Sequence, residues 1–344
     1  MDVRECTGSA GLCRPVPWNF GSNLARALSL IPMLFASIGS CADEFPKPLY
    51  ARNCPDPGVI LVDGIWYVTH TSGWDREGLF PILQSRDLTT WTVAGHIFPK
   101  SQRPVWASNG YEWWAPEIHK VNGRYVAYYC ARQNANKQFA IGAATAANPQ
   151  GPYTDIGKPL VSQKGMGLID AGYFKDAASG KHYLLWKEDG NAFNPPKPTN
   201  LVLMELEADG VSTKGKPHSL LKNDLRWEGD LIEAPSLVYR DGYYYLFYSA
   251  NAYYDDRYAV GVARSPALLG PYVKTPKPIL KSDARFSGPG HQFVIQKPDG
   301  DWLMFYHARD KNTGKKSRLL MLDKLQWNKN KWPEPIIPGK GTAL

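Results

Sequence analysis

The segment that decides the fold is LIEAPSLVYRDGYYYLFYSA, Leu231 to Ala250. In it a short apolar run, Leu237 to Tyr239, precedes Asp241-Gly242, a dipeptide that favours the positive φ angles of a two-residue hairpin turn. The run Tyr243 to Tyr248 follows, and aromatic residues suit a pleated, half-buried strand. The segment therefore predicts a β-hairpin, with the carboxylate of Glu233 at the head of its first strand.

The same unit occurs five times along the chain. Each copy has a polar or aromatic residue at its start, which we call the head, then an apolar strand, a turn that contains Gly, and an aromatic second strand. The turns recur about every 60 residues, and repeated four-stranded sheets of this kind are typical of a β-propeller. We therefore predict an all-β chain with a single catalytic domain, a five-bladed β-propeller. The five heads are Asp56, Trp114, Asp170, Glu233 and His291.

The repeat has a chemical consequence. Equivalent positions in five blades are related by a pseudo-fivefold rotation, so the heads are expected to meet at the central channel. Three carboxylates, one imidazole and one indole would then share one axial site. A propeller with a purely structural role has no reason to place three acids at the same phase of its repeat, because buried unpaired carboxylates are costly. The pattern therefore predicts a functional site at the axis.

Residues 1–42 differ from the rest of the chain. The apolar run LARALSLIPMLFASIG, Leu24 to Gly39, is short for a membrane span and has the length of a secretion signal's hydrophobic region. Small residues suited to cleavage follow, and the sequence up to Cys41 also resembles a lipobox, which would place a lipid anchor on Cys41. We predict a leader at 1–42, a propeller at 43–344, and a secreted or periplasmic protein; a buried N-terminal helix is the alternative.

The overall charge does not point to a particular partner. The 344 residues carry a formal net charge of +8, but lysines and arginines are scattered, which is typical of a solvated basic surface. Nothing resembles a nucleic-acid-binding module, and no segment after the leader is long enough to span a bilayer. We expect a monomer.

Outside the leader the cysteines are Cys54 and Cys130, which are expected either to pair or to be two buried thiols.

From about Pro46 to its end, the chain resembles glycoside hydrolase family 43, the five-bladed propellers that include arabinanases, α-L-arabinofuranosidases and β-xylosidases. The order, spacing and shared phase of five short motifs carry the resemblance: Pro55-Asp56-Pro57, Trp114-Ala115-Pro116-Glu117, Ile169-Asp170-Ala171, Ile232-Glu233-Ala234-Pro235 and Gly288-Pro289-Gly290-His291. The resemblance implies an inverting hydrolase of arabinofuranosyl or xylosyl linkages in plant polysaccharides or oligosaccharides. The arabinofuranosidase or arabinanase type is favoured, with β-xylosidase as the alternative.

The resemblance also implies residue roles. Asp56 would be the general base, Glu233 the general acid, and Asp170 the residue that tunes and orients that acid. His291 would help to hold a hydrated cation, most often calcium, in the channel; many members have a second histidine after it, where this chain has Gln292. The carboxyl chemistry agrees independently, because glycoside hydrolysis needs one protonated and one ionised carboxyl, separated by ~6.5–9.5 Å when the enzyme inverts.

Further side chains are candidates for substrate binding. Trp113 and Trp114 could stack on sugar faces, as could Trp106 and Tyr111, or they could pack between blades. Arg309 is expected either to bind substrate hydroxyls and orient a carboxylate, or to form a surface ion pair.

Two other classes of protein stay open. One is a carbohydrate-binding propeller without catalysis, which the three intact acids disfavour. The other is a retaining fructosidase on a related propeller, whose Asn-Asp-Pro and Glu-Cys motifs differ from Pro55-Asp56-Pro57 and Glu233-Ala234 here.

Overall fold

The computed structural model describes residues 47–336, except residues 72–76, 101, 109, 111 and 315. The predicted leader at 1–42, with the lipid-anchor candidate Cys41, lies outside the described residues, and so does Tyr111. Over the part of the chain that is described, there is no helix whose length and apolar character would suit a membrane span.

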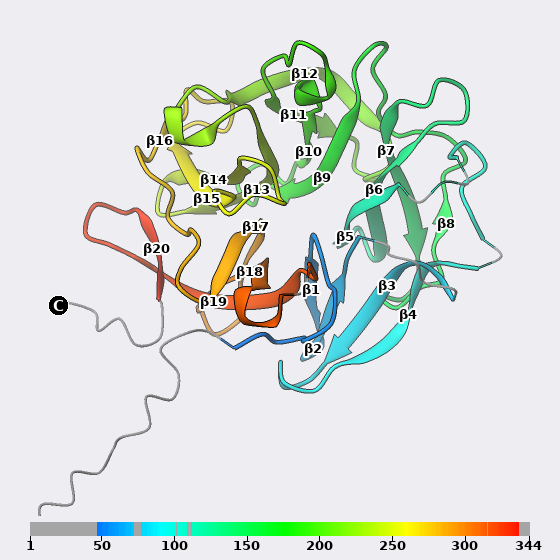
Figure 1. Ribbon diagram of the computed structural model, residues 1–344. Coiled ribbons are helices and arrows are strands. Elements are labelled where there is room, and N and C mark those ends of the chain that lie inside the picture. Colours follow the sequence, from blue (N-terminus) through cyan, green and yellow to red (C-terminus); the bar gives the residue numbers. More distant parts are fainter. Residues whose placement is uncertain are drawn as a thin grey trace, which may run out of the picture. The chain divides into compact units, whose positions relative to one another are not determined.

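Five four-stranded sheets are arranged around a central axis (Figure 1). In every sheet the strands lie in sequence order and each pairs antiparallel with the next. The first strands of the five sheets are innermost and contact one another around the ring, with β17 touching β1. The prediction of an all-β, five-bladed propeller is confirmed.

The first two blades use the chain up to residue 155. Blade one consists of β1 Gly58–Val62, β2 Ile65–Thr69, β3 Gly78–Ser85 and β4 Thr92–Pro99. Blade two consists of β5 Trp113–Val121, β6 Arg124–Arg132, β7 Phe139–Ala146 and β8 Thr154–Asp155.

The remaining blades follow with short 3₁₀ helices between their strands. Blade three consists of β9 Leu168–Lys175, β10 His182–Glu188, β11 Asn200–Leu206 and β12 Thr213–Lys222. Blade four consists of β13 Ile232–Arg240, β14 Tyr243–Ala250, β15 Ala259–Ser265 and β16 Val273–Lys274. Blade five consists of β17 Phe286–Gln296, β18 Trp302–Asp310, β19 Leu319–Trp327 and β20 Pro333–Ile336. The 3₁₀ helices are η1 Gly190–Ala192, η2 Arg226–Glu228 and η3 Lys311–Thr313.

The hairpin that predicted the fold has the expected turn. Arg240 of β13 pairs with Tyr243 of β14 across Asp241 and Gly242. Both turn residues have positive φ angles, 48° and 88°, as a two-residue turn that matches the twist of its strands requires. The pattern of a Gly-containing turn followed by an aromatic strand is therefore a reliable marker of each blade's first hairpin.

The hydrophobic core lies between the blades. Five clusters of buried residues each join two neighbouring blades, because a sheet buries both faces when sheets stand side by side around an axis. The aromatic second strands supply much of this core, including the fully buried Tyr129, Tyr245 and Tyr248. Cys54 and Cys130 are also buried, and they are free thiols.

The segment before β1 closes the ring. The Leu49 amide donates a hydrogen bond to the Leu320 carbonyl (2.8 Å), and the Cys54 amide donates to the Arg318 carbonyl (2.7 Å). The start of the described chain is thereby fastened to the third strand of the last blade. This seam holds the first head, Asp56, against residues of blade five.

Candidate active site

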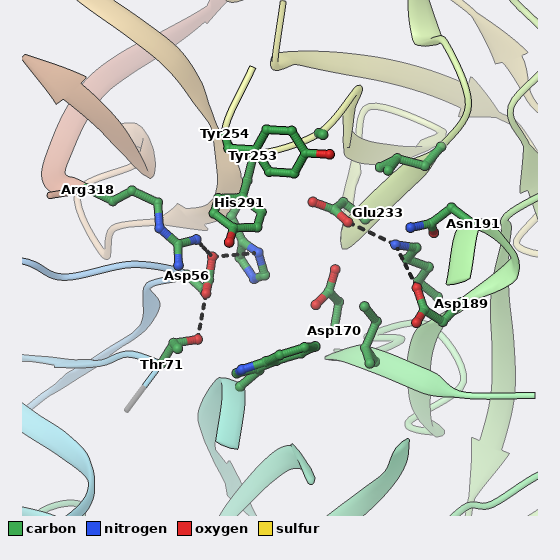
Figure 2. A pocket seen from close by; sticks show the side chains of 15 residues that line it. Asp56, Thr71, Asp170, Asp189, Asn191, Glu233, Tyr253, Tyr254, His291 and Arg318 are labelled. Carbon is green, nitrogen blue, oxygen red and sulfur yellow. Dashed lines mark hydrogen bonds and ion pairs between the residues drawn. The ribbon is translucent and has the colours of Figure 1, made fainter. Parts of the chain in front are cut away.

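All five heads line one cavity of about 300 Å³ at the propeller axis (Figure 2). The structure thus brings Asp56, Trp114, Asp170, Glu233 and His291 together, as the phase of the repeat predicts. The cavity has further lining residues that the sequence did not single out: Thr71, Ile169, Lys187, Asp189, Asn191, Leu231, Ala252, Tyr253, Tyr254 and Arg318.

A left-handed residue stands at the inner end of every blade. In three blades it is the head itself, with φ of 57°, 58° and 51° at Asp56, Asp170 and His291. In the other two it is the alanine after the head, with φ of 45° and 54° at Ala115 and Ala234. The first strands of blades two to five are all irregular at this point, since their register shifts at Trp114, Asp170, Glu233 and His291. The heads of blades two and four are therefore offset by one residue from the strict fivefold equivalence that the sequence suggested.

Side chains of the preceding blade bind the amides of these left-handed residues. Four such pairs are described: Ala115 N to Thr71 Oγ1 (2.9 Å), Ala234 N to Asp170 Oδ2 (3.0 Å), His291 N to Ser249 Oγ (2.7 Å) and Asp56 N to His307 Nδ1 (3.2 Å). Because a buried amide without a partner is costly, these bonds stabilise a backbone that is otherwise disfavoured for residues other than Gly.

Asp56 lies in a cationic environment. Arg318 Nη1 donates to its Oδ1 (2.7 Å), Thr71 Oγ1 donates to its Oδ2 (2.5 Å), and His291 Nδ1 lies 3.3 Å from Oδ1. Burial opposes the charge of this carboxylate, but Arg318, His291 and Thr71 together hold the pKa of Asp56 well below its usual range. Asp56 is therefore ionised over the working pH range of an ordinary enzyme.

His307 supports Asp56 as a neutral imidazole. Its side chain is fully buried, and burial lowers the pKa of His307 well below its ordinary value. Its Nδ1 accepts the hydrogen bond from the Asp56 amide, so the proton is on Nε2. The ring stacks on Tyr258, with centroids 5.8 Å apart. His307 therefore orients the backbone of Asp56 instead of neutralising its charge.

Glu233 has a donor on each carboxyl oxygen. Lys187 Nζ lies 2.9 Å from Oε2, and the Tyr258 hydroxyl donates to Oε1 (2.8 Å). Lys187 is itself 1% exposed and also pairs with Asp189 (3.3 Å). Burial disfavours the ammonium, yet the surrounding carboxylates, with Glu233 the strongest, raise the pKa of Lys187 above its ordinary value. Glu233 is thus held in one orientation, as a group that must reach a fixed point of a substrate requires.

Asp170 is the carboxyl whose protonation is most strongly altered. It is buried, and burial raises the pKa of Asp170 to about 7, with the charge of Glu233 acting in the same direction and His291 against it. Two neighbouring carboxyls that repel each other titrate as a pair. Asp170, beside Glu233, therefore keeps a proton up to about neutral pH, while Asp56 is ionised.

The surroundings of His291 suit a hydrated cation better than a fully coordinated one. Its Nδ1 faces Asp56, which leaves Nε2 as the nitrogen for an ion. No group of three or more His, Cys, Asp or Glu side chains that could hold a metal forms within the described ranges. Gln292 is engaged elsewhere, since it accepts from Ser249 and donates to the Ala234 carbonyl. Calcium prefers oxygen ligands, so an ion beside His291 would need to keep most of its water.

Trp113, predicted as a stacking residue, does not line the cavity and takes the alternative place between blades. Its side chain is 2% exposed and packs against Phe80 and Tyr129, and its indole nitrogen donates to the Gly110 carbonyl. Successive side chains of a strand point to opposite faces. Trp114, the next residue, accordingly lines the cavity and packs against Phe139 with 4.2 Å between ring centroids. Trp106, another stacking candidate, is partly buried and stacks on Tyr129.

Of the two arrangements expected for Arg309, the structure shows the ion pair and not a place in the cavity wall. Arg309 donates to the Tyr254 carbonyl (2.6 Å) and pairs with Asp256 (3.2 Å), and it does not line the cavity. The guanidinium in the site belongs to Arg318, at the seam, which no local sequence signal distinguished.

The chain and its fold are those of a known family. The family model "Glycosyl hydrolases family 43" matches residues 45–333. The β-D-galactofuranosidase of Aspergillus niger is 30% identical over 297 residues, covering 82% of each chain. The extracellular endo-α-(1→5)-L-arabinanase 1 of Bacillus subtilis is 29% identical over 298 residues, covering 81% of this chain and 86% of the relative. The solved structure of a thermostable family-43 glycoside hydrolase superposes with a TM-score of 0.75 at 27% identity, covering 85% and 95% of the two chains.

The contrast between the two adjacent tryptophans is testable by unfolding. Trp113→Ala should lower the free energy of unfolding by about 3–5 kcal/mol, since it opens a cavity in the core between blades one and two. Trp114→Ala, at a partly buried position that borders the cavity, should lower the free energy of unfolding by only about 1–2 kcal/mol. Urea unfolding of both variants measures this difference. Equal losses would contradict the assignment of one side chain to the core and the other to the site.

Proposed function

Because this chain belongs to family 43 of the glycosyl hydrolases, and so is an enzyme that hydrolyses glycosidic bonds, we propose that it acts by inversion on pentose linkages of plant polysaccharides or oligosaccharides. Asp56 is the general base and Glu233 the general acid. Asp170 shares a proton with Glu233 and orients the Glu233 carboxyl. The observation that supports this division most directly is the opposite shift of two carboxyls around one cavity, since the pKa of Asp56 lies below its usual range and the pKa of Asp170, beside Glu233, lies above it.

Each environment suits one half of the reaction. Arg318 and Thr71 keep Asp56 ionised, so it can accept a proton from water. Asp170 keeps a proton up to about neutral pH beside Glu233, and Glu233 can pass such a proton to the leaving oxygen. Enzymes that invert need such a pair of acid and base with a water between the base and the sugar.

The reaction then proceeds in a single displacement. A water hydrogen-bonded to Asp56 attacks the anomeric carbon and passes its proton to Asp56. The bond from that carbon to the leaving oxygen breaks, and Glu233 gives its proton to this oxygen. Lys187 and Tyr258 keep the Glu233 carboxyl in place, and the newly ionised Glu233 is stabilised by the Lys187 ammonium.

The arabinofuranosidase or arabinanase type is the favoured activity. The two relatives described above are named for a galactofuranoside and for α-1,5-linked arabinan, which supports a furanoside substrate. A β-xylosidase is the alternative within the same family. The second relative is also named extracellular, which supports a secreted or periplasmic protein with its leader removed or lipidated. Activity on linear arabinan, arabinoxylan and xylobiose, with analysis of products, separates the activities.

Substitutions of the acid and the base should differ in their dependence on the leaving group. Glu233→Ala should lose ~10²–10⁴-fold in kcat on natural linkages but less on aryl pentosides, because an activated leaving group does not need a proton. Asp56→Ala should lose activity on both, since water must always be activated. Proton NMR of the first-formed product should show inversion. Retention would mean a covalent intermediate and would remove Asp56 from the role of base.

Asp170 should set the alkaline limit of activity. The acid pair must hold a proton, and the raised pKa of Asp170, about 7, means that this proton is lost as the pH rises through neutrality. Asp170→Asn removes the repulsion between the two carboxylates, which favours retention of the proton. The basic limb of the kcat/KM profile should therefore move to lower pH by about one unit. A basic limb that stays in place would show that Asp170 does not tune the acid.

The hydrated calcium ion that we propose beside His291 is testable by removal. Dialysis against a chelator should lower activity and the melting temperature, and added calcium should restore both, because a ligand that binds only the folded state stabilises it. His291→Ala provides the control, since it should lose the response to chelator. A wild-type protein that is indifferent to the chelator in both measurements would contradict the ion.

A further inference from the structure

Two exposed tyrosines stand side by side at the cavity. Tyr253 is 48% exposed and Tyr254 is 70% exposed, in the loop 251–258 between β14 and β15, and both line the cavity (Figure 2). The other strongly exposed large apolar side chains among the described residues lie elsewhere: Val93, Val105, Tyr239, Leu269, Val273 and Ile336. Within the described ranges, a pair of exposed aromatic rings therefore occurs only at the cavity, and such rings are typical of ligand sites.

The two rings are not equivalent. They pack edge to face, 5.4 Å apart at 80°. The Arg318 guanidinium covers Tyr253 at 4.5 Å from the ring centroid, and the same guanidinium binds Asp56. Tyr253 is therefore part of the support of the carboxylate. Tyr254 is the ring that stays more exposed, and it is available to a ligand.

The backbone of this loop is fixed from blade five. Arg309 binds the Tyr254 carbonyl through Nη1 and Asp256 through Nη2, and only 17% of the Arg309 side chain is exposed. Gly288 provides the room for this contact. A Cβ at Gly288 would lie 3.0 Å from Arg309 Nη2 and 3.2 Å from the Asp255 carbonyl. The contact fixes the loop to the neighbouring blade, at the point where the exposed ring begins.

We propose that Tyr254 stacks on a sugar unit beyond the one at the scissile bond, and that Arg309 is the positioning residue that holds it there. This rests on the proposed function, because it assumes a pentose oligosaccharide in the cavity. A tyrosine ring offers a flat apolar face to the C–H side of a sugar and a hydroxyl at its edge. The enzyme therefore prefers chains of several units to single pentosides.

Binding to an acid-disabled enzyme tests the stacking role without turnover. In a Glu233→Gln background, calorimetry with arabino- and xylo-oligosaccharides of one to four units should show affinity that rises with length. Adding Tyr254→Ala should raise the Kd for the longer chains about tenfold, and this increase should grow with chain length. The matched control is Tyr239→Ala, a tyrosine 44% exposed away from the cavity, which should change nothing.

Kinetics of the active enzyme test the positioning role of Arg309. Arg309→Ala should raise KM for longer chains with little change in kcat, and Arg309→Lys should recover part of the loss. In the double variant with Tyr254→Ala, the arginine substitution should add nothing, since its effect passes through the ring. If the increases in KM of the two single variants add in the double variant, and Arg309→Ala also lowers the melting temperature, then Arg309 has only a structural role.

The outcomes separate this proposal from the proposed function. If Tyr254→Ala leaves the length dependence of affinity intact, the stacking role is wrong although the enzyme still cleaves pentosides. If the acid-disabled protein binds neither series and the wild-type protein cleaves none, both proposals fall together.

Discussion

A strained backbone residue at the inner end of each blade is the constraint on which the site depends. A left-handed conformation costs a residue with a Cβ on the order of 1–3 kcal/mol, and the described chain adopts it at all five inner strands. Four of the amides at this turn are bound by side chains of the preceding blade, which locks blades one, two, four and five to the blade before them at the axis. The strain also redirects the strand, which brings side chains into a channel that a regular sheet would fill with apolar residues.

The same hydrogen bonds connect the fold to the chemistry. Thr71 binds the Ala115 amide and also Asp56, and Asp170 binds the Ala234 amide next to Glu233. Groups that join neighbouring blades are therefore also groups that orient the proposed acid and base. This arrangement explains how a cavity with several buried charges is tolerated, because almost every charge has a fixed partner.

Sequence alone predicts the repeat well and the site in part. Gly-containing turns and aromatic strands are local signals, so the blade count and the five heads follow from them. Which of two adjacent tryptophans faces the channel depends on the register of a bulged strand, and this has no local signal. Lys187, within a strand that reads as apolar, and Arg318, far along the chain from Asp56, are recognisable only once the blades are assembled.

The seam between the ends of the propeller has a consequence for how activity relates to folding. Asp56 precedes the first strand, while Arg318, His291 and His307 belong to the last blade. The proposed base is thus assembled from residues near the two ends of the described chain, and we expect it to be complete only when the ring is closed. We expect a molecule with its seam open to keep most of its sheets and the proposed acid Glu233, but to have no catalytic activity. Enzymatic turnover therefore reports the closed ring more stringently than secondary structure does.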